Sequence, residues 1–178
     1  MKLNFNKSGF SLIEILVVIV ILGVLGTVAT QSLFSLLRGA AKTEVVKEVK
    51  QNGDYALSVM EVKLRNSTIT DSDCTAAVSG ATSLTLTDPG FPAFSFRCVV
   101  DGSTNRISQF ISGQDQYLTN TSVTLPTCMT TDISFTCINT AGVKNILIKF
   151  TLTQAQAGAQ GAESASQVFQ TQVTLRNK

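Results

Sequence analysis

Residues 8–30 read SGFSLIEILVVIVILGVLGTVAT, and this stretch decides the architecture of the chain. Within it, residues 10–29 hold a single ionisable side chain, Glu14. A helix of 20 residues rises about 30 Å, the thickness of a bilayer's hydrocarbon core. A buried strand is the alternative for so many Val and Ile residues, but strands of that length are rare and no turn residue folds the segment back. We therefore predict a membrane-spanning helix.

The flanking residues predict how this helix is oriented and whether it is kept. Lys2 and Lys7 precede it, so the positive-inside rule places the N-terminus in the cytoplasm and the C-terminal bulk across the membrane. A secretory signal peptide also starts with basic residues and an apolar run, but no Ala-x-Ala cleavage site follows. The helical pattern instead continues through Ser35, Arg38 and Lys42, and we expect the apolar segment to be retained.

Glu14 is the one charge inside this apolar segment. An unpaired carboxylate at the centre of a membrane helix costs at least about 2.5 kcal/mol. Glu14 therefore either lies near the cytoplasmic end and extends to the lipid headgroups, or has a counter-ion.

The string Ser8-Gly9-Phe10-Ser11-Leu12-Ile13-Glu14 resembles the processing motif of bacterial type IV pilins and of type II secretion pseudopilins. The resemblance implies that a prepilin peptidase cleaves between Gly9 and Phe10 on the cytoplasmic side and methylates the new amino group of Phe10. It also implies that Glu14, the fifth residue of the mature chain, pairs with the amino group of Phe10 on a neighbouring subunit. A free α-amino group has a pKa of about 8, so it is a suitable counter-ion at neutral pH.

Two further features bear on assembly. Removal of Lys2 and Lys7 takes the 14 basic side chains to 12, equal to the 12 acidic ones, so subunits would pack without strong mutual repulsion. Many major pilins have a proline where this chain has Gln31, which favours a straighter helix and a minor subunit. Gly23 and Gly26 are then either weak points of the helix or sites of close packing between subunits.

Beyond the membrane segment the apolar spacing predicts that the helix runs from Phe10 to about Arg65. Oppositely charged pairs at i, i+4 spacing, Lys50 with Asp54 and Glu61 with Arg65, support it. The apolar stripe consists of Leu33, Leu37, Ala41, Val45, Val49, Ala56, Met60 and Leu64.

From Thr68 onward, Thr, Ser, Asn and Gly residues alternate with apolar ones, which is typical of short strands. We expect a small antiparallel sheet with a hairpin formed by residues 132–139 and 145–154. The expected strands are 83–86, 94–100, 107–112, 132–139, 145–154 and 168–176, with turns at 88–90, 101–102 and 141–142 and an exposed loop at 155–166.

The sequence thus predicts an α+β, pilin-like fold in which a long N-terminal helix packs on a small antiparallel β-sheet head. The expected organisation is a cytoplasmic leader at 1–9, a transmembrane or filament-core helix at 10–37, an amphipathic continuation at 38–66 and a β-rich exported head at 67–178.

Four cysteines, Cys74, Cys98, Cys128 and Cys137, all lie in the part expected to be exported. An even number in an oxidising compartment favours two disulfides, and we expect Cys74 with Cys98 and Cys128 with Cys137 because these are nearer in sequence. Buried free thiols are the alternative. A zinc site is disfavoured, since the chain has no C-x-x-C pair and no histidine.

The composition disfavours an enzyme and a nucleic-acid-binding protein. The absence of histidine excludes every mechanism that uses an imidazole, and no Ser-x-x-Lys motif is present for an anchored hydrolase. Basic and acidic residues are balanced and interleaved, so we expect no direct nucleic-acid binding. We expect no cofactor and no metal. Asp101, Asp115 and Asp132 are either solvated loop carboxylates or a calcium site of the kind that certain pseudopilins carry.

The resemblance implies a structural subunit of a type IV pilus or a type II secretion pseudopilus. Its partners would be the prepilin peptidase, other subunits, and the platform protein and ATPase of the assembly machine. It would cross the bacterial inner membrane once, with its N-terminus in the cytoplasm, and then enter a periplasmic or cell-surface filament. The alternative is an uncleaved membrane-anchored binding or adhesion module, and the choice between pilus, secretion and DNA uptake stays open.

Overall fold

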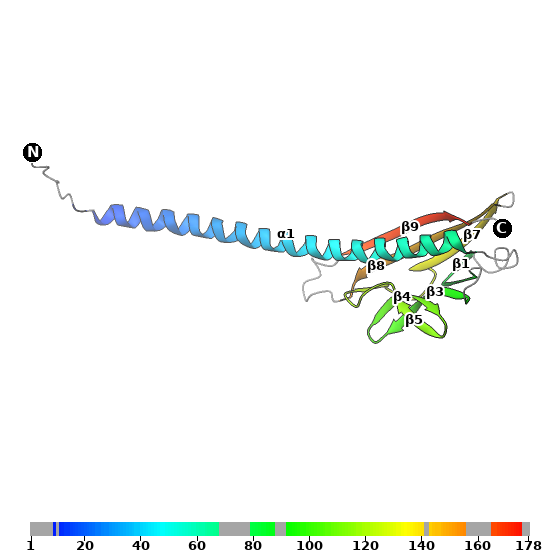
Figure 1. The fold of residues 1–178 in the computed structure, drawn as a ribbon. Helices are drawn as coiled ribbons and strands as arrows, with labels where there is room; N and C mark the ends of the chain where they lie inside the picture. Colours follow the sequence, from blue (N-terminus) through cyan, green and yellow to red (C-terminus); the bar gives the residue numbers. More distant parts are fainter. Residues whose placement is uncertain are drawn as a thin grey trace, which may run out of the picture. The chain divides into compact units, whose positions relative to one another are not determined.

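The computed structural model describes residues 9, 11–67, 79–87, 92–140, 143–155 and 165–175 of the 178-residue chain. Residues 1–41 and 42–178 form two compact units, and we call the second unit the head. Helix α1 spans Leu12–Asn66 and is followed by strands (Figure 1). The strands are β1 (Ser79–Ala81), β2 (Ser83–Leu86), β3 (Phe94–Asp101), β4 (Thr104–Ile111), β5 (Gln114–Tyr117), β6 (Val123–Thr124), β7 (Ile133–Thr140), β8 (Val143–Gln154) and β9 (Ser166–Thr174).

Polar groups in the chain itself terminate α1. The Ser67 N–H donates to the Leu64 carbonyl at 3.1 Å, and the Ser67 hydroxyl donates to the Lys63 carbonyl at 2.6 Å. These bonds satisfy carbonyl groups that have no partner within the helix. The predicted end near Arg65 is therefore correct to one residue, whereas Phe10, the predicted start, lies outside the described residues.

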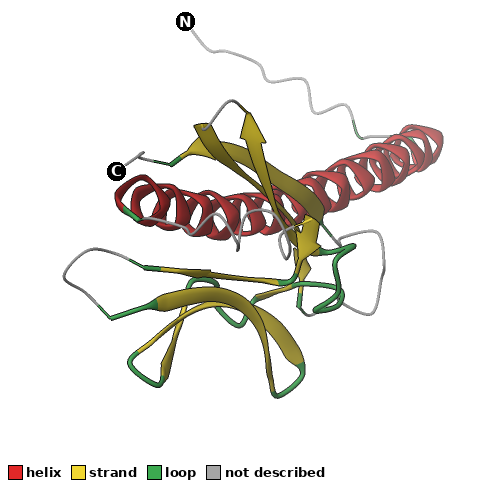
Figure 2. Ribbon diagram, turned by 90° about the vertical axis from the view of Figure 1, so that its right-hand side faces the viewer, coloured by secondary structure: helices red, strands yellow, loops and turns green. Residues whose placement is uncertain are grey.

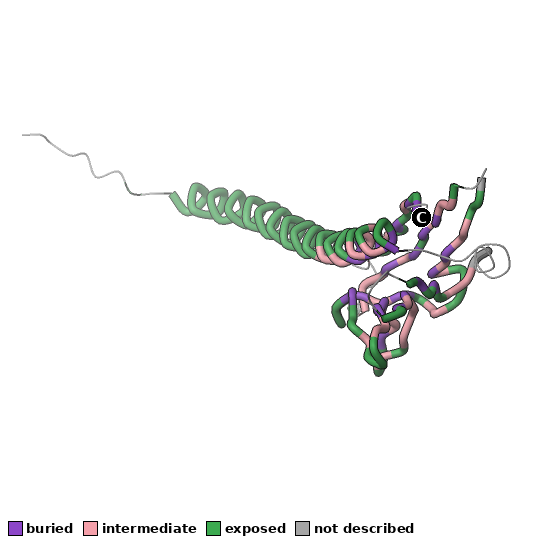
Figure 3. Tube along the Cα trace, turned by 45° about the vertical axis from the view of Figure 1, so that its right-hand side comes forward, coloured by how far each residue is buried: buried purple, intermediate pink, exposed green. Residues whose placement is uncertain are grey.

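The apolar stripe of α1 that is buried against the head core is shorter than the predicted one. Figure 3 shows exposed residues along the N-terminal part of the helix and mixed burial toward its C-terminal end. Leu33, Leu37 and Ala41 are exposed, so the stripe is buried only from Val49 onward. The buried residues of the helix are Val49, Gly53, Ala56, Met60 and Leu64. Gly53 fills the gap of seven residues that the predicted apolar stripe left between Val49 and Ala56.

The head contains two antiparallel sheets instead of the single small sheet expected (Figure 2). In one sheet, β8 is central, with β7, β1 and β6 on one side and β9 on the other. The other sheet is a meander in the order β2-β3-β4-β5. Gly102 and Gly113 adopt positive φ in its tight turns, which a residue without a Cβ atom accommodates.

One hydrophobic core joins the helix to both sheets. Phe94 and Phe96 of β3 pack edge to face with ring centroids 5.6 Å apart, and Phe150 of β8 stacks on Phe169 of β9 at 5.3 Å. Aromatic pairs at these separations add to the stabilisation from burial. The chain is therefore an α+β protein in which the long N-terminal apolar helix packs on antiparallel β-sheets, as predicted.

Most predicted strands are present, with shifted ends. The hairpin of β7 and β8 is confirmed, while β4 begins at Thr104 instead of Ile107. Strands β1, β5 and β6 were missed because they have only three, four and two residues, too few for an alternating pattern. The turns at 88–90 and 141–142 and most of the loop at 155–166 lie outside the described residues.

Candidate functional site

The N-terminal turn of α1 is capped by its own sequence. The Glu14 N–H lies 3.0 Å from the Ser11 carbonyl and 3.3 Å from the Ser11 hydroxyl oxygen, both of which accept from it. Ser11 is thus the N-cap and Glu14 the third helical residue, which is the Ser-x-x-Glu spacing of a capping box. An acidic residue in the first turn also stabilises the helix, because its negative charge interacts favourably with the positive end of the helix dipole. The spacing that resembles the processing motif therefore also fixes where the helix starts.

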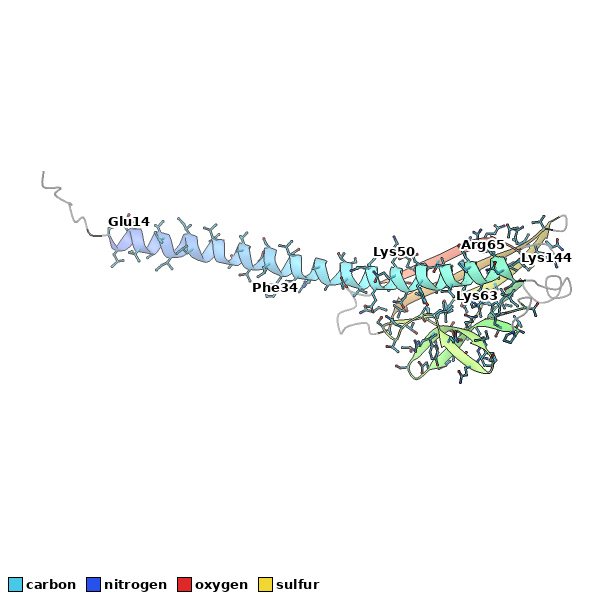
Figure 4. All side chains as sticks on the ribbon, in the orientation of Figure 1. Glu14, Phe34, Lys50, Lys63, Arg65 and Lys144 are labelled. Atoms are coloured by element: carbon cyan, nitrogen blue, oxygen red, sulfur yellow. A yellow bond between two sulfur atoms is a disulfide. The ribbon has the colours of Figure 1, made fainter. Side chains whose placement is uncertain are left out.

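The Glu14 carboxylate has no partner in the part of the chain that the structure describes. No hydrogen bond or ion pair is recorded for its side-chain oxygens there, and the residue is exposed in the first turn (Figure 4). Between Ile15 and Leu37 the helix carries no other charged residue. The carboxylate is consequently available to a group from outside the described chain. Phe10, whose amino group is the expected partner, lies outside the described residues.

The apolar side chains of the segment from Leu12 to Leu37 are open on every side of the helix. Their exposed fractions lie between 46% for Val18 and 83% for Leu12. By length and composition α1 is able to cross a membrane. Because apolar surface is unfavourable in water at about 25 cal/mol per Å², this segment requires lipid or other protein around it.

Three hydroxyl groups in the same segment donate to carbonyl groups of the helix itself. Thr27 donates to the Val24 carbonyl and Thr30 to the Gly26 carbonyl, both at 2.8 Å, and Ser32 donates to the Val28 carbonyl at 3.0 Å. Internal satisfaction of polar groups is what an apolar surrounding requires. These three hydroxyl groups are therefore compatible with an apolar surrounding.

The glycines of this region are not required by the fold of the chain. A Cβ atom added at Gly9, Gly23 or Gly26 would meet no atom within 4 Å. Helix α1 is continuous through Gly23 and Gly26. Any requirement for glycine at these three positions must then come from a molecule that contacts the chain, not from its own packing.

Hydrogen bonds between residues far apart in sequence join α1 to the loops and strands of the head, and the sequence pattern did not predict them. The Asn120 N–H donates to Asn52 Oδ1 at 2.9 Å, and the Ser122 hydroxyl donates to Glu48 Oε1. Thr171 of β9 donates to Glu61 Oε1 at 2.6 Å, so Glu61 bonds a strand instead of Arg65.

The expected ion pair of Lys50 with Asp54 is also absent among the described residues. The helix has a different ion pair there, in which Lys47 Nζ lies 3.9 Å from Glu44 Oε1. Lys63 lies over the Phe94 ring, with its Nζ atom 5.8 Å from the ring centroid. The contact of Lys63 with Phe94 is one that helical spacing alone does not reveal.

An ion pair stabilises the outer face of the four-stranded sheet. Arg97 donates two hydrogen bonds to Asp115, Nε to Oδ1 at 3.0 Å and Nη2 to Oδ2 at 2.6 Å, while its guanidinium stacks 4.0 Å from the Phe110 ring centroid. The pKa of Asp115 is lowered, chiefly by the hydrogen bond from Arg97. Burial opposes this effect, and the hydrogen bond from the Ser108 hydroxyl lowers the pKa further.

The other loop carboxylates expected to be solvated or to bind calcium are engaged by neighbouring side chains. Asp101 forms an ion pair with Arg106 at 2.8 Å, and Asp132 accepts a hydrogen bond from the Thr127 hydroxyl. Asp101, Asp115 and Asp132 therefore each have a protein partner of their own. No cluster of three or more Cys, Asp or Glu residues able to hold a metal occurs among the described residues.

The predicted disulfide pairing is wrong. Cys98 is bonded to Cys128, with Cα atoms 5.4 Å apart, and Cys137 is also disulfide-bonded. Cys128 reaches Cys98 because the segment before it lies along β4, where the Leu125 N–H donates to the Asn105 carbonyl at 2.9 Å. Cys74 lies outside the described residues.

Comparison with known proteins identifies the N-terminal segment. Residues 4–30 match the model of the prokaryotic N-terminal methylation motif. No curated protein and no solved structure matches the chain. The match includes Gly9, Phe10 and Glu14, so it covers the residues that the sequence singled out.

Proposed function

Because the chain carries the N-terminal methylation motif that marks type IV pilins and pseudopilins, we propose that it is a structural subunit of a type IV pilus or a type II secretion pseudopilus. The observation that carries this proposal is that one helix combines two features: its apolar side chains are exposed on all sides, and the Glu14 carboxylate at its start has no partner among the described residues.

Processing creates the missing counter-ion. Cleavage between Gly9 and Phe10 frees an α-amino group four residues before Glu14, about one helical turn away. The amino group, with a pKa of about 8, is cationic at neutral pH and offsets the unfavourable burial of the carboxylate in an apolar surrounding. When the amino group comes from a neighbouring copy, the pair sets the axial register of one subunit on the next.

The open position of Gly9 supports cleavage at this bond. With no atom of the chain within 4 Å of an added Cβ, the peptidase rather than the fold is the reason for a small residue there. Lys2 and Lys7 keep the leader on the cytoplasmic side, so the cut precedes extraction of the subunit from the inner membrane. A platform protein and an ATPase would drive that extraction.

The proposal is tested by the mass of the protein purified from its own cells. We expect a chain that starts at Phe10 and is one methyl group heavier than the unmodified form, recovered both in the membrane and in sheared filaments. A chain that still begins at Met1 and is found only as a solitary membrane protein would support an anchored binding or adhesion module instead.

A further inference from the structure

The Glu48 side chain of α1 lines a small pocket in the head. The pocket has a volume of about 260 Å³ and is lined by Glu48, Thr121, Ser122 and Gln154. This is several times the volume of about 30 Å³ that one water molecule occupies. Glu48 is half-buried there, and we call this hollow the Glu48 pocket. It is large enough to receive the end of a side chain from another molecule.

Oxygen atoms at the Glu48 pocket lack hydrogen-bond donors. Glu48 Oε1 accepts from the Ser122 hydroxyl and, at 3.4 Å, from Asn120 Nδ2, but Oε2 accepts from no described residue. Gln154 has a side-chain oxygen that is shielded from solvent and has no hydrogen-bond partner among the described residues. Since a shielded acceptor without a donor is unfavourable, the pocket favours a ligand with several N–H groups.

The charge of Glu48 is also unbalanced in the described part of the chain. The neighbouring Lys47 pairs with Glu44 at 3.9 Å, and the other two ion pairs of the described residues lie in the four-stranded sheet. Partial burial removes water that would otherwise solvate the carboxylate, and this makes a counter-ion more favourable. The ligand that best satisfies the Glu48 pocket is therefore a cation that donates hydrogen bonds.

Arg65, in the last turn of α1, is a cation of this kind without a partner (Figure 4). It is exposed, and it forms no hydrogen bond or ion pair with the described residues. Glu61, one turn earlier, bonds Thr171 instead. The other arginines that the structure describes in the head, Arg97 and Arg106, each form an ion pair within it. The Arg65 guanidinium is therefore available to another molecule.

We propose that Arg65 of one copy of the chain binds in the Glu48 pocket of another copy in the same filament. The planar guanidinium carries several N–H donors and matches a carboxylate with two parallel hydrogen bonds, whereas a lysine ammonium acts as a point charge. The proposal rests on the proposed function, because it requires copies that lie side by side in a filament.

This contact keeps every copy in the same orientation. Glu48 and Arg65 lie 17 residues apart on one helix, which is about 26 Å along its axis. A second copy that is displaced along the axis by this distance, without being turned over, brings its pocket level with Arg65 of the first. The two partners are different surfaces of the chain, so the contact is heterologous and repeats along a filament.

The displacement also agrees with the register set by Glu14. A step of four residues, from Phe10 of one copy to Glu14 of the next, is about 6 Å along the helix. The longer displacement of about 26 Å therefore joins copies that are several such steps apart. The Arg65 contact adds to the Glu14 pairing and does not replace it.

Carbodiimide cross-linking of sheared filaments tests the contact. The reagent joins a lysine amine to a carboxylate that it touches, with loss of water, and leaves arginine unchanged. Arg65→Lys keeps the charge, so its filaments should give a peptide linked between positions 48 and 65 that the wild type lacks. Within one copy these positions are about 26 Å apart, so the link must join two copies. Arg38→Lys, the matched control on the same helix, should give no link to Glu48.

Charge reversal tests whether the contact contributes to assembly. Glu48→Arg alone and Arg65→Glu alone each set like charges together, so each should lower the share of the variant in filaments. The double variant restores opposite charges between copies and should recover most of that loss. No recovery, with all three heads melting at the wild-type temperature, would contradict the proposal.

The outcomes separate this proposal from the proposed function. Filaments that form from the methylated chain but give no link between positions 48 and 65 would overturn the Arg65 contact alone, whereas a chain that forms no filament would overturn both. A link from Lys42 or Lys50 to Glu48 would assign the pocket to another side chain. A melting temperature that rises with calcium chloride, but not in Glu48→Gln, would make it a metal site. Either result would also overturn the proposal.

Discussion

Gly53 of α1 lies directly against the ring of Phe169 in β9, so close that a Cβ atom added to the glycine would overlap the ring. The same ring stacks on Phe150 of β8. The helix therefore approaches this sheet at a point where it has no side chain, and Phe169 fills the space.

Replacing Gly53 with Ala should destabilise the head. Because the added Cβ would overlap the Phe169 ring, we expect an overpacking cost in the upper part of the usual range, about 2–3 kcal/mol. The better helix propensity of Ala returns about 1 kcal/mol, so the expected net loss is about 1–2 kcal/mol. The melting temperature followed by circular dichroism would measure it. Gly39→Ala is the control, because its added Cβ meets nothing within 4 Å. Full stability of Gly53→Ala, or no partial recovery when Phe169→Leu is added, would disprove the contact.

The sequence predicted α1 well because helical signals are local. The apolar spacing from Val49 to Leu64 and the change of composition after Ser67 can both be read within a few residues. The role of Gly53 could not be predicted from neighbouring residues, because it depends on the Phe169 ring more than a hundred residues later in the chain. The bonds of Glu48 to Ser122 and of Asn52 to Asn120 could not be predicted for the same reason.

The N-terminal methylation motif was recognisable for a similar reason, since Gly9, Phe10 and Glu14 fall within six consecutive residues. The cysteine pairing was not, because proximity in sequence ignores topology. The β3–β4 hairpin and the bonds from Asn105 to residues 124–126 bring Cys128 to Cys98, which a count of intervening residues cannot show.

Removal of the Cys98–Cys128 bond should lower stability without changing the fold. The two residues are 30 apart in sequence, and a cross-link of that length contributes about 2–4 kcal/mol. Cys98→Ser with Cys128→Ser should therefore unfold at a clearly lower denaturant concentration, measured by urea titration. An unchanged midpoint would show that the bond does not constrain the unfolded chain.

Acid should destabilise the head through Asp115. Its pKa is lowered in the folded state, chiefly by the Arg97 hydrogen bond, so its contribution is present above the unfolded pKa of about 4 and is lost as the pH falls through the folded value. Asp115→Asn should give a flatter loss of melting temperature from about pH 5 downward than the wild type. Asp54→Asn, an exposed helix carboxylate, is the control and should keep the wild-type slope. Identical slopes for all three proteins would contradict this account.

Gly9→Val should block processing while leaving the fold intact. A Cβ atom added at Gly9 meets no atom within 4 Å, so we expect the effect to arise at the peptidase. Immunoblots should show only the longer precursor, with the head as resistant to proteolysis as in the wild type. Gly23→Val is a matched control, since it is equally open but distant from the cleavage site. Normal cleavage of Gly9→Val would remove the leader assignment.

The central claim is that the Glu14 carboxylate pairs with the amino group of a neighbouring Phe10, and Glu14→Gln tests it most directly. The variant keeps the size of the side chain and removes its charge. In cells that express equal amounts of both forms, we predict equal cleavage and methylation but at least about a tenfold lower share of the variant in sheared filaments, since loss of a desolvated pair exceeds 1.4 kcal/mol. Equal shares of variant and wild type in the filaments, at equal processing, would contradict the account.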